Sequence, residues 1–214
     1  MGVNLTKGGN VSLIKAAEMT GLARLSRITV GCGWDINTAG GRNYDLDLSV
    51  AGLGTDRRVP QHDDPSDHGW QEWFVWANHR HPANHSINFT GDNRTGAGDG
   101  DDETILVNLD DVPDSVQTLV FAVIIWRGDQ YRQHFGNVQN AFIRIYDQVS
   151  GTEIARYDLG TEFADETLVM FGELYRYGGD WKFRAVGQGY SGPAYQAEFG
   201  IRHTFHTDYA RYSN

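Results

Sequence analysis

The sequence predicts an all-β fold, an antiparallel β-sandwich built from two sheets. Apolar residues recur with a period of two or in short runs, which is typical of half-buried and buried strands. Glycine, aspartate and asparagine separate these runs, and such residues favour tight turns. Long stretches with helical periodicity are missing, so no helical layer is expected.

Ten strands are expected, which is enough for two packed sheets. In chain order they are Val11–Lys15, Ile28–Trp34, Tyr44–Leu53, Trp73–Asn78, Thr104–Leu109, Gln117–Trp126, Ala141–Asp147, Glu153–Leu159, Thr167–Tyr175 and Trp181–Val186. Glycine between β-rich runs, in QVSGTEI (148–154) and YGGDW (177–181), predicts two hairpins.

The chain is expected to form one domain over residues 1–202. Residues 55–72 are polar and without periodicity, so we interpret them as a long loop inserted in the sandwich. One short helix is expected in SGPAYQAEFG, residues 191–200. Residues 203–214 are predicted to form a polar C-terminal tail.

Composition excludes several classes of protein. With 214 residues, a net charge of −10 and a pI near 5.1, the chain lacks the basic surface that nucleic acid or an anionic membrane requires. The longest apolar run, LVFAVIIW at 119–126, is far shorter than the ~20 residues of a membrane helix, and MGVNLTKGGNVSLIK has no signal-peptide core. The single cysteine, Cys32, is expected in the core and fits a reducing compartment, so we expect a cytoplasmic protein.

An acidic loop stands out at residues 90–103, TGDNRTGAGDGDDE. Its five carboxylates against Arg94 give −4, and each like-charge pair at about 4 Å costs roughly 1 kcal/mol even in water. Ca²⁺ prefers carboxylate, amide and backbone oxygens, which this glycine-rich loop supplies. The loop is not an EF-hand, because Arg94, Gly96 and Ala97 occupy places where that motif needs ligands and glycine. It either binds a cation or is simply solvated.

A second acidic element lies in NYDLDLSVAGL, residues 43–53. Asp45 and Asp47 alternate with leucines, so they share the strand face that points away from those leucines. They are either solvated or complete a metal site with a neighbouring loop. Asp35, at the end of ITVGCGW, is a further candidate, with initiation of a turn as its alternative role.

Several segments together resemble the TerD-type tellurium-resistance and stress-response family, from about Leu5 to about Ile201. They are LTKGGNVSL, GWD, YDLDLS, TGDNRTGAGDGDDE, AFIRIYD, EIARYDL and ETLVMFGELYRYGGDWKFRAVGQGY. That family is a calcium-binding β-sandwich of cytoplasmic bacterial proteins without established catalytic activity. Residues 55–88 and the final TFHTDYARYSN depart from the family pattern.

The resemblance implies one or two calcium ions bound by loops at one end of the sheets. It implies a role in stress response and tellurite resistance through calcium-dependent binding or assembly. The expected partners are other stress-response proteins, membrane-associated ones included. The implied metal ligands are Asp35, Asp45, Asp47, Asp92, Asn93, Asp99, Asp101, Asp102 and Glu103.

A histidine-rich segment leaves a transition-metal site open as an alternative. His79, His81 and His85 follow closely on one another, with His62, Asp63, Asp64 and His68 upstream. Because this spacing is loose, exposed loop histidines are the better interpretation.

The sequence bears on three other function classes. The tryptophans of WQEWFVW (Trp70, Trp73, Trp76) suggest a calcium-stabilised carbohydrate-binding module, although core packing is their simpler use. No enzyme is expected, because the chain has no GxSxG, HExxH or Walker motif and the acidic loop offers no apolar pocket to raise a pKa. The third class is a calcium-dependent adaptor that docks a protein or an anionic headgroup once the metal neutralises the acidic rim, a switch compatible with the net charge of −10.

Overall fold

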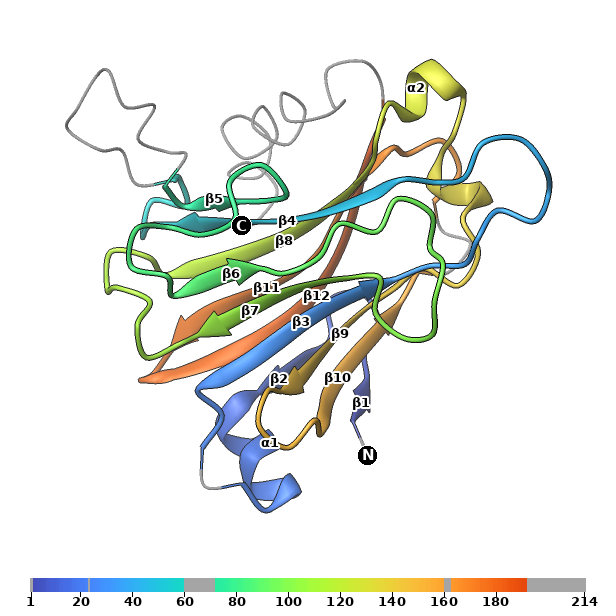
Figure 1. The fold of residues 1–214 in the computed structure, drawn as a ribbon. Coiled ribbons are helices and arrows are strands. Elements are labelled where there is room, and N and C mark those ends of the chain that lie inside the picture. The colour runs from blue at the N-terminus through green and yellow to red at the C-terminus, as the bar shows by residue number, and fades with distance from the viewer. Residues whose placement is uncertain (1, 23, 60–71, 160–162, 192–214) are drawn as a thin grey trace, which may run out of the picture.

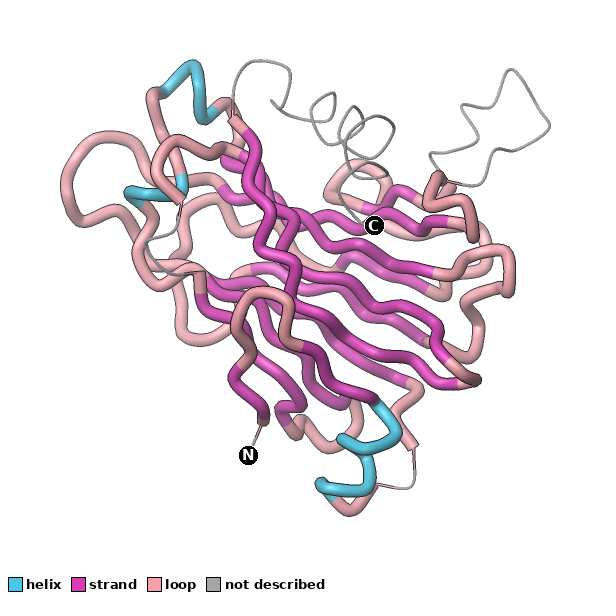
Figure 2. Tube along the Cα trace, turned by 180° about the vertical axis from the view of Figure 1, so that it is seen from behind, coloured by secondary structure: helices cyan, strands magenta, loops and turns pink. Residues whose placement is uncertain are grey.

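The computed structural model describes residues 2–22, 24–59, 72–159 and 163–191. They form two packed six-stranded sheets, which confirms the predicted all-β, two-sheet architecture (Figure 1). Figure 2 shows the same layers from behind, with helices confined to short segments outside the sheets. Three predicted features lie outside the described residues: most of the helix at 191–200, residues 60–71 of the long loop, and the tail with its domain boundary at 202.

The first sheet has the strand order β1-β10-β9-β3-β7-β6. All its pairs are antiparallel except β1 with β10, which is parallel. Its strands are β1 (Val3–Asn4), β3 (Arg27–Gly33), β6 (Ile87–Phe89), β7 (Glu103–Asn108), β9 (Phe142–Asp147) and β10 (Glu153–Asp158).

The second sheet has the order β2-β12-β11-β8-β4-β5 and is antiparallel throughout. Its strands are β2 (Asn10–Ser12), β4 (Leu46–Leu53), β5 (Phe74–Val75), β8 (Thr118–Ile125), β11 (Leu168–Tyr177) and β12 (Asp180–Tyr190). Strand β8 lies between β11 and β4 and is buried along its whole length, which explains its unbroken apolar sequence.

Eight of the ten predicted strands are confirmed, namely β3, β4, β7, β8, β9, β10, β11 and β12. Both predicted hairpins are confirmed as the β9–β10 and β11–β12 connections. At the second, Gly178 and Gly179 have φ of 60° and 83°, the left-handed conformation that tight hairpin turns require. The short strands β1 and β6 were not predicted.

The predicted strand Val11–Lys15 is wrong beyond Ser12. Helix α1 (Leu13–Thr20) begins there, because the Ser12 side chain accepts a hydrogen bond from the Lys15 backbone N–H and caps the helix. The helix ends at Gly21, whose φ of 73° provides the left-handed C-terminal cap. The only other helical segments among the described residues are α2 (Gly128–Tyr131) and the 3₁₀ turn η1 (Phe135–Asn137).

The predicted strand Trp73–Asn78 is also too long. Only β5, Phe74–Val75, pairs with β4. Beyond it, the backbones of Trp76 and His79 bond each other in both directions, which turns the chain away from the sheet. Among the described residues, no helix has the length and apolar character needed to cross a membrane.

Three long connections meet at one end of the sandwich. They are residues 34–45 between β3 and β4, 90–102 between β6 and β7, and 126–141 between β8 and β9 (Figure 1, right). The strand register explains this, since Cys32 at the end of β3 pairs with Glu103 at the start of β7, and Leu46 at the start of β4 pairs with Ile125 at the end of β8. Most predicted site residues belong to these connections.

Candidate metal centre

Three of the predicted ligands come together in an acidic cluster, formed by Asp45, Asp47 and Asp92. One carboxylate oxygen of each lies within 4.8 Å of the others. Asp45 and Asp47 share one face at the start of β4, while Asp92 comes from the loop before β7. Leu46, between the two strand aspartates, is 0% exposed, so the predicted alternation is confirmed. The cluster therefore joins the two sheets at their loop-rich end.

Glu103 lies beside this cluster and is the most buried acid of the site. Its side chain is 1% exposed, and Oε2 accepts a hydrogen bond of 2.6 Å from the Leu48 backbone N–H. That N–H is available because β5 covers β4 only at Val50 and Ala51. The other oxygen, Oε1, is buried without a hydrogen-bond partner. An unpaired buried carboxylate oxygen is costly, so this atom calls for a proton or a cation.

The electrostatics of the centre point the same way. Burial raises the pKa of Glu103 to about 9. The hydrogen bond from the Leu48 N–H lowers this pKa in part, and repulsion from the cluster carboxylates raises it further. Burial also raises the pKa of Asp47 to about 7, with help from Asp45 and Asp92. The expectation that the acidic loop offers no surroundings that raise a pKa is wrong at Glu103, because β7 carries this residue between the sheets.

Arg94 forms an ion pair with one residue of the cluster, Asp92. Its Nη2 lies 3.0 Å from Asp92 Oδ2, and its side chain is 73% exposed. One exposed guanidinium cannot balance three carboxylates, since an exposed ion pair is worth only about 0–1 kcal/mol.

Asn93 and Asp102 organise the acidic loop. Asp102 Oδ1 accepts a bond of 2.6 Å from Asn93 Nδ2, and Oδ2 accepts one of 2.8 Å from the Trp34 N–H. Asn93 also bonds the backbone of Thr95 and Ala97, which folds the loop over itself. Burial raises the pKa of Asp102. The hydrogen bond from the Trp34 N–H lowers this pKa in part, and repulsion from Asp101 and Asp35 raises it further.

The structure does not bring the remaining candidates into the cluster. Asp101 forms hydrogen bonds of 2.7 and 3.0 Å with Arg144 and lies over Gly31. Because Gly31 faces away from the core, Asp101 is on the outer face of the first sheet. Asp35 accepts a bond of 2.6 Å from Asn140, and Asp99 is exposed. Metal binding by these three residues stays a prediction.

A divalent cation with oxygen ligands fits the acidic cluster. Two oxygens on one Ca²⁺ lie at most about 5 Å apart, given Ca–O distances of about 2.3–2.6 Å, and the cluster meets this limit. The unpaired Oε1 of Glu103 is a further available ligand atom. With such an ion bound, the three aspartates would supply ligands from both sheets, and Glu103 would lie beside them.

The histidines and tryptophans have ordinary structural surroundings where they are described. His81 and His85 are exposed and stack with ring centroids 3.8 Å apart, while His79 bonds the Phe74 carbonyl. Trp73 is 7% exposed and belongs to the core, and Trp76 packs against it. His62, Asp63, Asp64, His68 and Trp70 lie outside the described residues.

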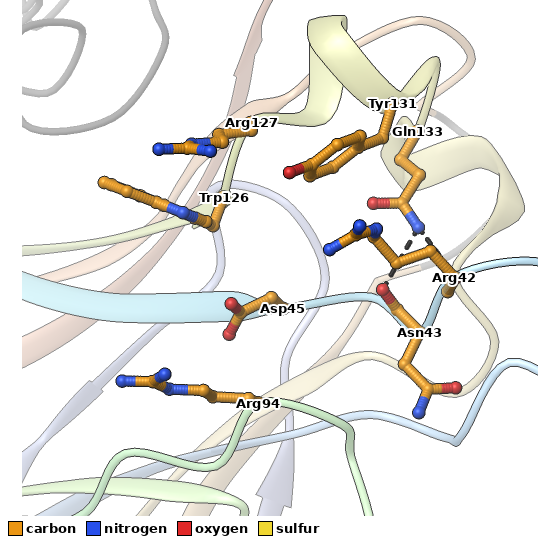
Figure 3. A pocket seen from close by; sticks show the side chains of 8 residues that line it. All are labelled: Arg42, Asn43, Asp45, Arg94, Trp126, Arg127, Tyr131 and Gln133. Atoms are coloured by element: carbon orange, nitrogen blue, oxygen red, sulfur yellow. Dashed lines mark hydrogen bonds between the residues drawn. The ribbon is translucent and has the colours of Figure 1, made fainter.

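Two adjoining pockets open beside the cluster. The smaller, of about 230 Å³, contains all three cluster residues in its lining. The larger, of about 460 Å³, shares Asp45, Arg94 and Trp126 with it (Figure 3). We call the larger one the arginine pocket; its other lining residues are Arg42, Asn43, Arg127, Tyr131 and Gln133. Sequence reasoning missed these residues because three separate connections supply them and no local motif marks them.

Both the sequence and the structure of this chain match known proteins. Residues 1–196 match the family model described as TerD domain. The chain is 44% identical to the tellurium resistance protein TerD of Serratia marcescens, over 94% of this chain and 98% of that protein. It is 40% identical to general stress protein 16U of Bacillus subtilis, over 90% and 93%. A crystal structure of a TerD homologue from Streptomyces coelicolor superposes with a TM-score of 0.62 at 23% identity, over 82% of this chain and 98% of that one.

Proposed function

Since the chain belongs to the TerD family, we propose that it binds Ca²⁺ at the acidic cluster and serves in bacterial stress response, tellurite resistance included. It would act by calcium-dependent binding and assembly and not by catalysis. The names of its relatives, which include tellurium resistance and general stress proteins, support the biological role.

One observation carries the calcium proposal. The buried Glu103 Oε1 has no partner, and it lies next to three aspartates whose oxygens are close enough to share one ion. A cation there would satisfy the orphan oxygen and cancel the repulsion within the cluster.

The geometry supports a structural role for the ion. The cluster contains Asp45 and Asp47 from the second sheet and Asp92 from the first sheet's loop, and Glu103 begins β7 of the first sheet. A cation bound by these groups would tie the ends of both sheets together and fix the acidic loop. Binding to the folded state alone would also stabilise the fold by linkage.

The ion would change the surface that partners meet. One Ca²⁺ adds +2 at the loop-rich end of a chain with a net charge of −10, and two ions would add +4. A fixed, less acidic loop could then dock other stress-response proteins, including membrane-associated ones. We place this activity in the cytoplasm, which suits a chain whose one cysteine is buried and free.

The test is calorimetric titration of the chelator-stripped full chain with Ca²⁺, with Mg²⁺ and Zn²⁺ as controls. Asp47→Asn removes a ligand charge from the cluster, whereas Asp99→Asn makes the same change at an exposed loop residue. We expect Asp47→Asn to weaken calcium binding by about tenfold or more, which is about 1.4 kcal/mol, and Asp99→Asn to change it little.

Two results would count against the proposal. Absence of saturable calcium binding would leave the cluster as solvated surface. If Asp99→Asn lost calcium affinity while Asp47→Asn kept it, the ion would be bound by the loop and not by the cluster.

A further inference from the structure

The arginine pocket is positively charged on a strongly acidic protein. Three guanidinium groups and one carboxylate line it, for a formal net charge of +2, while the whole chain carries −10. Arg94 is paired with Asp92. Among the described residues, Arg42 and Arg127 form no ion pair with any carboxylate. Unpaired cations gathered in a concave site favour an anionic ligand.

The two unpaired arginines are held in place by the protein. The Arg42 guanidinium lies 4.2 Å from the centre of the Tyr131 ring, and that of Arg127 lies 5.6 Å from the Trp126 ring. Figure 3 shows Arg42 and Tyr131 on one side of the pocket, Trp126 and Arg127 on the other, and Asp45 and Arg94 below. Because these contacts already restrict the two arginine side chains, a ligand that binds them loses less side-chain entropy.

The backbone supports the same arrangement. Arg127 has φ of 53°, in the left-handed region that residues with side chains rarely adopt, just after β8. The buried Gln133 donates bonds of 2.9 Å to the Arg42 carbonyl and 3.2 Å to the Asn43 carbonyl. Gln133 thus ties the 34–45 connection to the 126–141 connection, and this contact sets the position of Arg42 relative to Arg127.

The size and lining of the pocket define the ligand further. Its volume, about 460 Å³, is within the range of about 300–1,000 Å³ typical of sites for organic ligands and exceeds what one inorganic oxyanion fills. Guanidinium groups match phosphate oxygens in planar, two-point hydrogen bonds. The half-buried rings of Trp126 and Tyr131 offer apolar surface to the rest of the molecule.

We propose that the arginine pocket binds a small organic phosphate, with its phosphate held by Arg42 and Arg127 and its organic part against Trp126 and Tyr131. The site adjoins the acidic cluster and shares Asp45 with it, but neither phosphate-binding arginine belongs to that cluster. A phosphate bound by these arginines needs no metal ion.

The test measures binding of AMP, inorganic phosphate, pyrophosphate and adenosine to the full chain by calorimetry in the presence of EDTA. Adenosine lacks the phosphate, and the two inorganic ions lack the organic part. The variants are Arg42→Gln, Arg127→Gln and, as matched control, Arg132→Gln. Arg132 flanks the same short helix with φ of 54° but does not line the pocket.

We expect AMP to bind more tightly than inorganic phosphate, and adenosine to bind least. Arg42→Gln and Arg127→Gln should each weaken AMP by about tenfold or more, the usual effect of losing a charge-assisted hydrogen bond, and Arg132→Gln should leave it unchanged. Asp47→Asn, which disables the calcium cluster but does not line this pocket, should retain AMP binding.

Three results would overturn the proposal. They are no binding of any phosphate at millimolar concentration, equal losses in Arg127→Gln and Arg132→Gln, and loss of AMP binding in Asp47→Asn with the arginines intact. Inorganic phosphate binding as tightly as AMP would overturn the organic part of the assignment. Thermal melts of each variant separate lost binding from lost folding.

Discussion

Replacing Glu103 by glutamine should stabilise the calcium-free protein and weaken the calcium-bound one. Glutamine keeps the shape of the side chain, and its oxygen can still accept the Leu48 N–H. Its amide would take the place of the unpaired Oε1, in a site where the cluster carboxylates repel the native charge. The substitution thus supplies donors where the native carboxylate needs a proton.

The magnitude follows from the raised pKa. Glu103 has a pKa of about 9 in the folded state, against 4.5 for an ordinary glutamate in the unfolded chain. For an acid whose folded pKa is raised, stability is full below the unfolded value and is lost as the pH rises toward the folded value. At pH 7 the loss is up to about 3 kcal/mol, at about 1.36 kcal/mol for each pKa unit between 4.5 and 7.

The assay is a series of thermal melts between pH 5 and pH 8, in EDTA and in calcium. In EDTA the wild type should lose stability as the pH rises, while Glu103→Gln should lose less and melt higher at pH 7. About 3 kcal/mol corresponds to roughly 6–12 °C for a chain of this size. In calcium the order should reverse, because the variant lacks one ligand charge.

The control is Glu18→Gln, which removes the same charge from an exposed position on α1. It should leave both melting curves close to those of the wild type. The reasoning is refuted if Glu103→Gln melts at or below the wild type in EDTA at pH 7, or if wild-type stability does not fall across this pH range.

Two further substitutions test other parts of the site. Gly31→Ala should destabilise the fold by about 1–3 kcal/mol, because the Cβ of the new alanine would collide with the Asp101 carboxylate. An unchanged midpoint in denaturant unfolding would contradict this close approach. Arg94→Gln should tighten calcium binding by up to about fivefold, since an exposed ion pair with Asp92 is worth about 1 kcal/mol at most; weaker binding in titration would mean that Arg94 supports the cation site instead of competing with it.

Local patterns in the sequence were sufficient for much of the fold. The alternation of Leu46 and Leu48 with Asp45 and Asp47 predicted both the strand β4 and the face that carries its acids. Glycines at 151, 178 and 179 predicted the hairpins, because tight turns need left-handed backbone. These features depend on neighbours along the chain.

Local patterns did not predict the type or length of the short elements, because tertiary contacts decide both. The run from Val11 to Lys15 is apolar enough for a strand, but the Ser12 cap and Gly21 enclose a helix that buries Leu13 against the core. Strand β5 is short because Trp76 and His79 bond each other instead of continuing along β4.

The acid content of the site was evident from the sequence alone, and so was the resemblance to the TerD family. Only the tertiary structure selected Asp45, Asp47 and Asp92 as one cluster, placed Asp101 on the opposite face with Arg144, and buried Glu103 between the sheets. The physical reason is that local sequence sets which residues alternate along a strand. Distances between carboxylates, their burial and the arginine pocket depend instead on which connections the packed sheets bring to the same end.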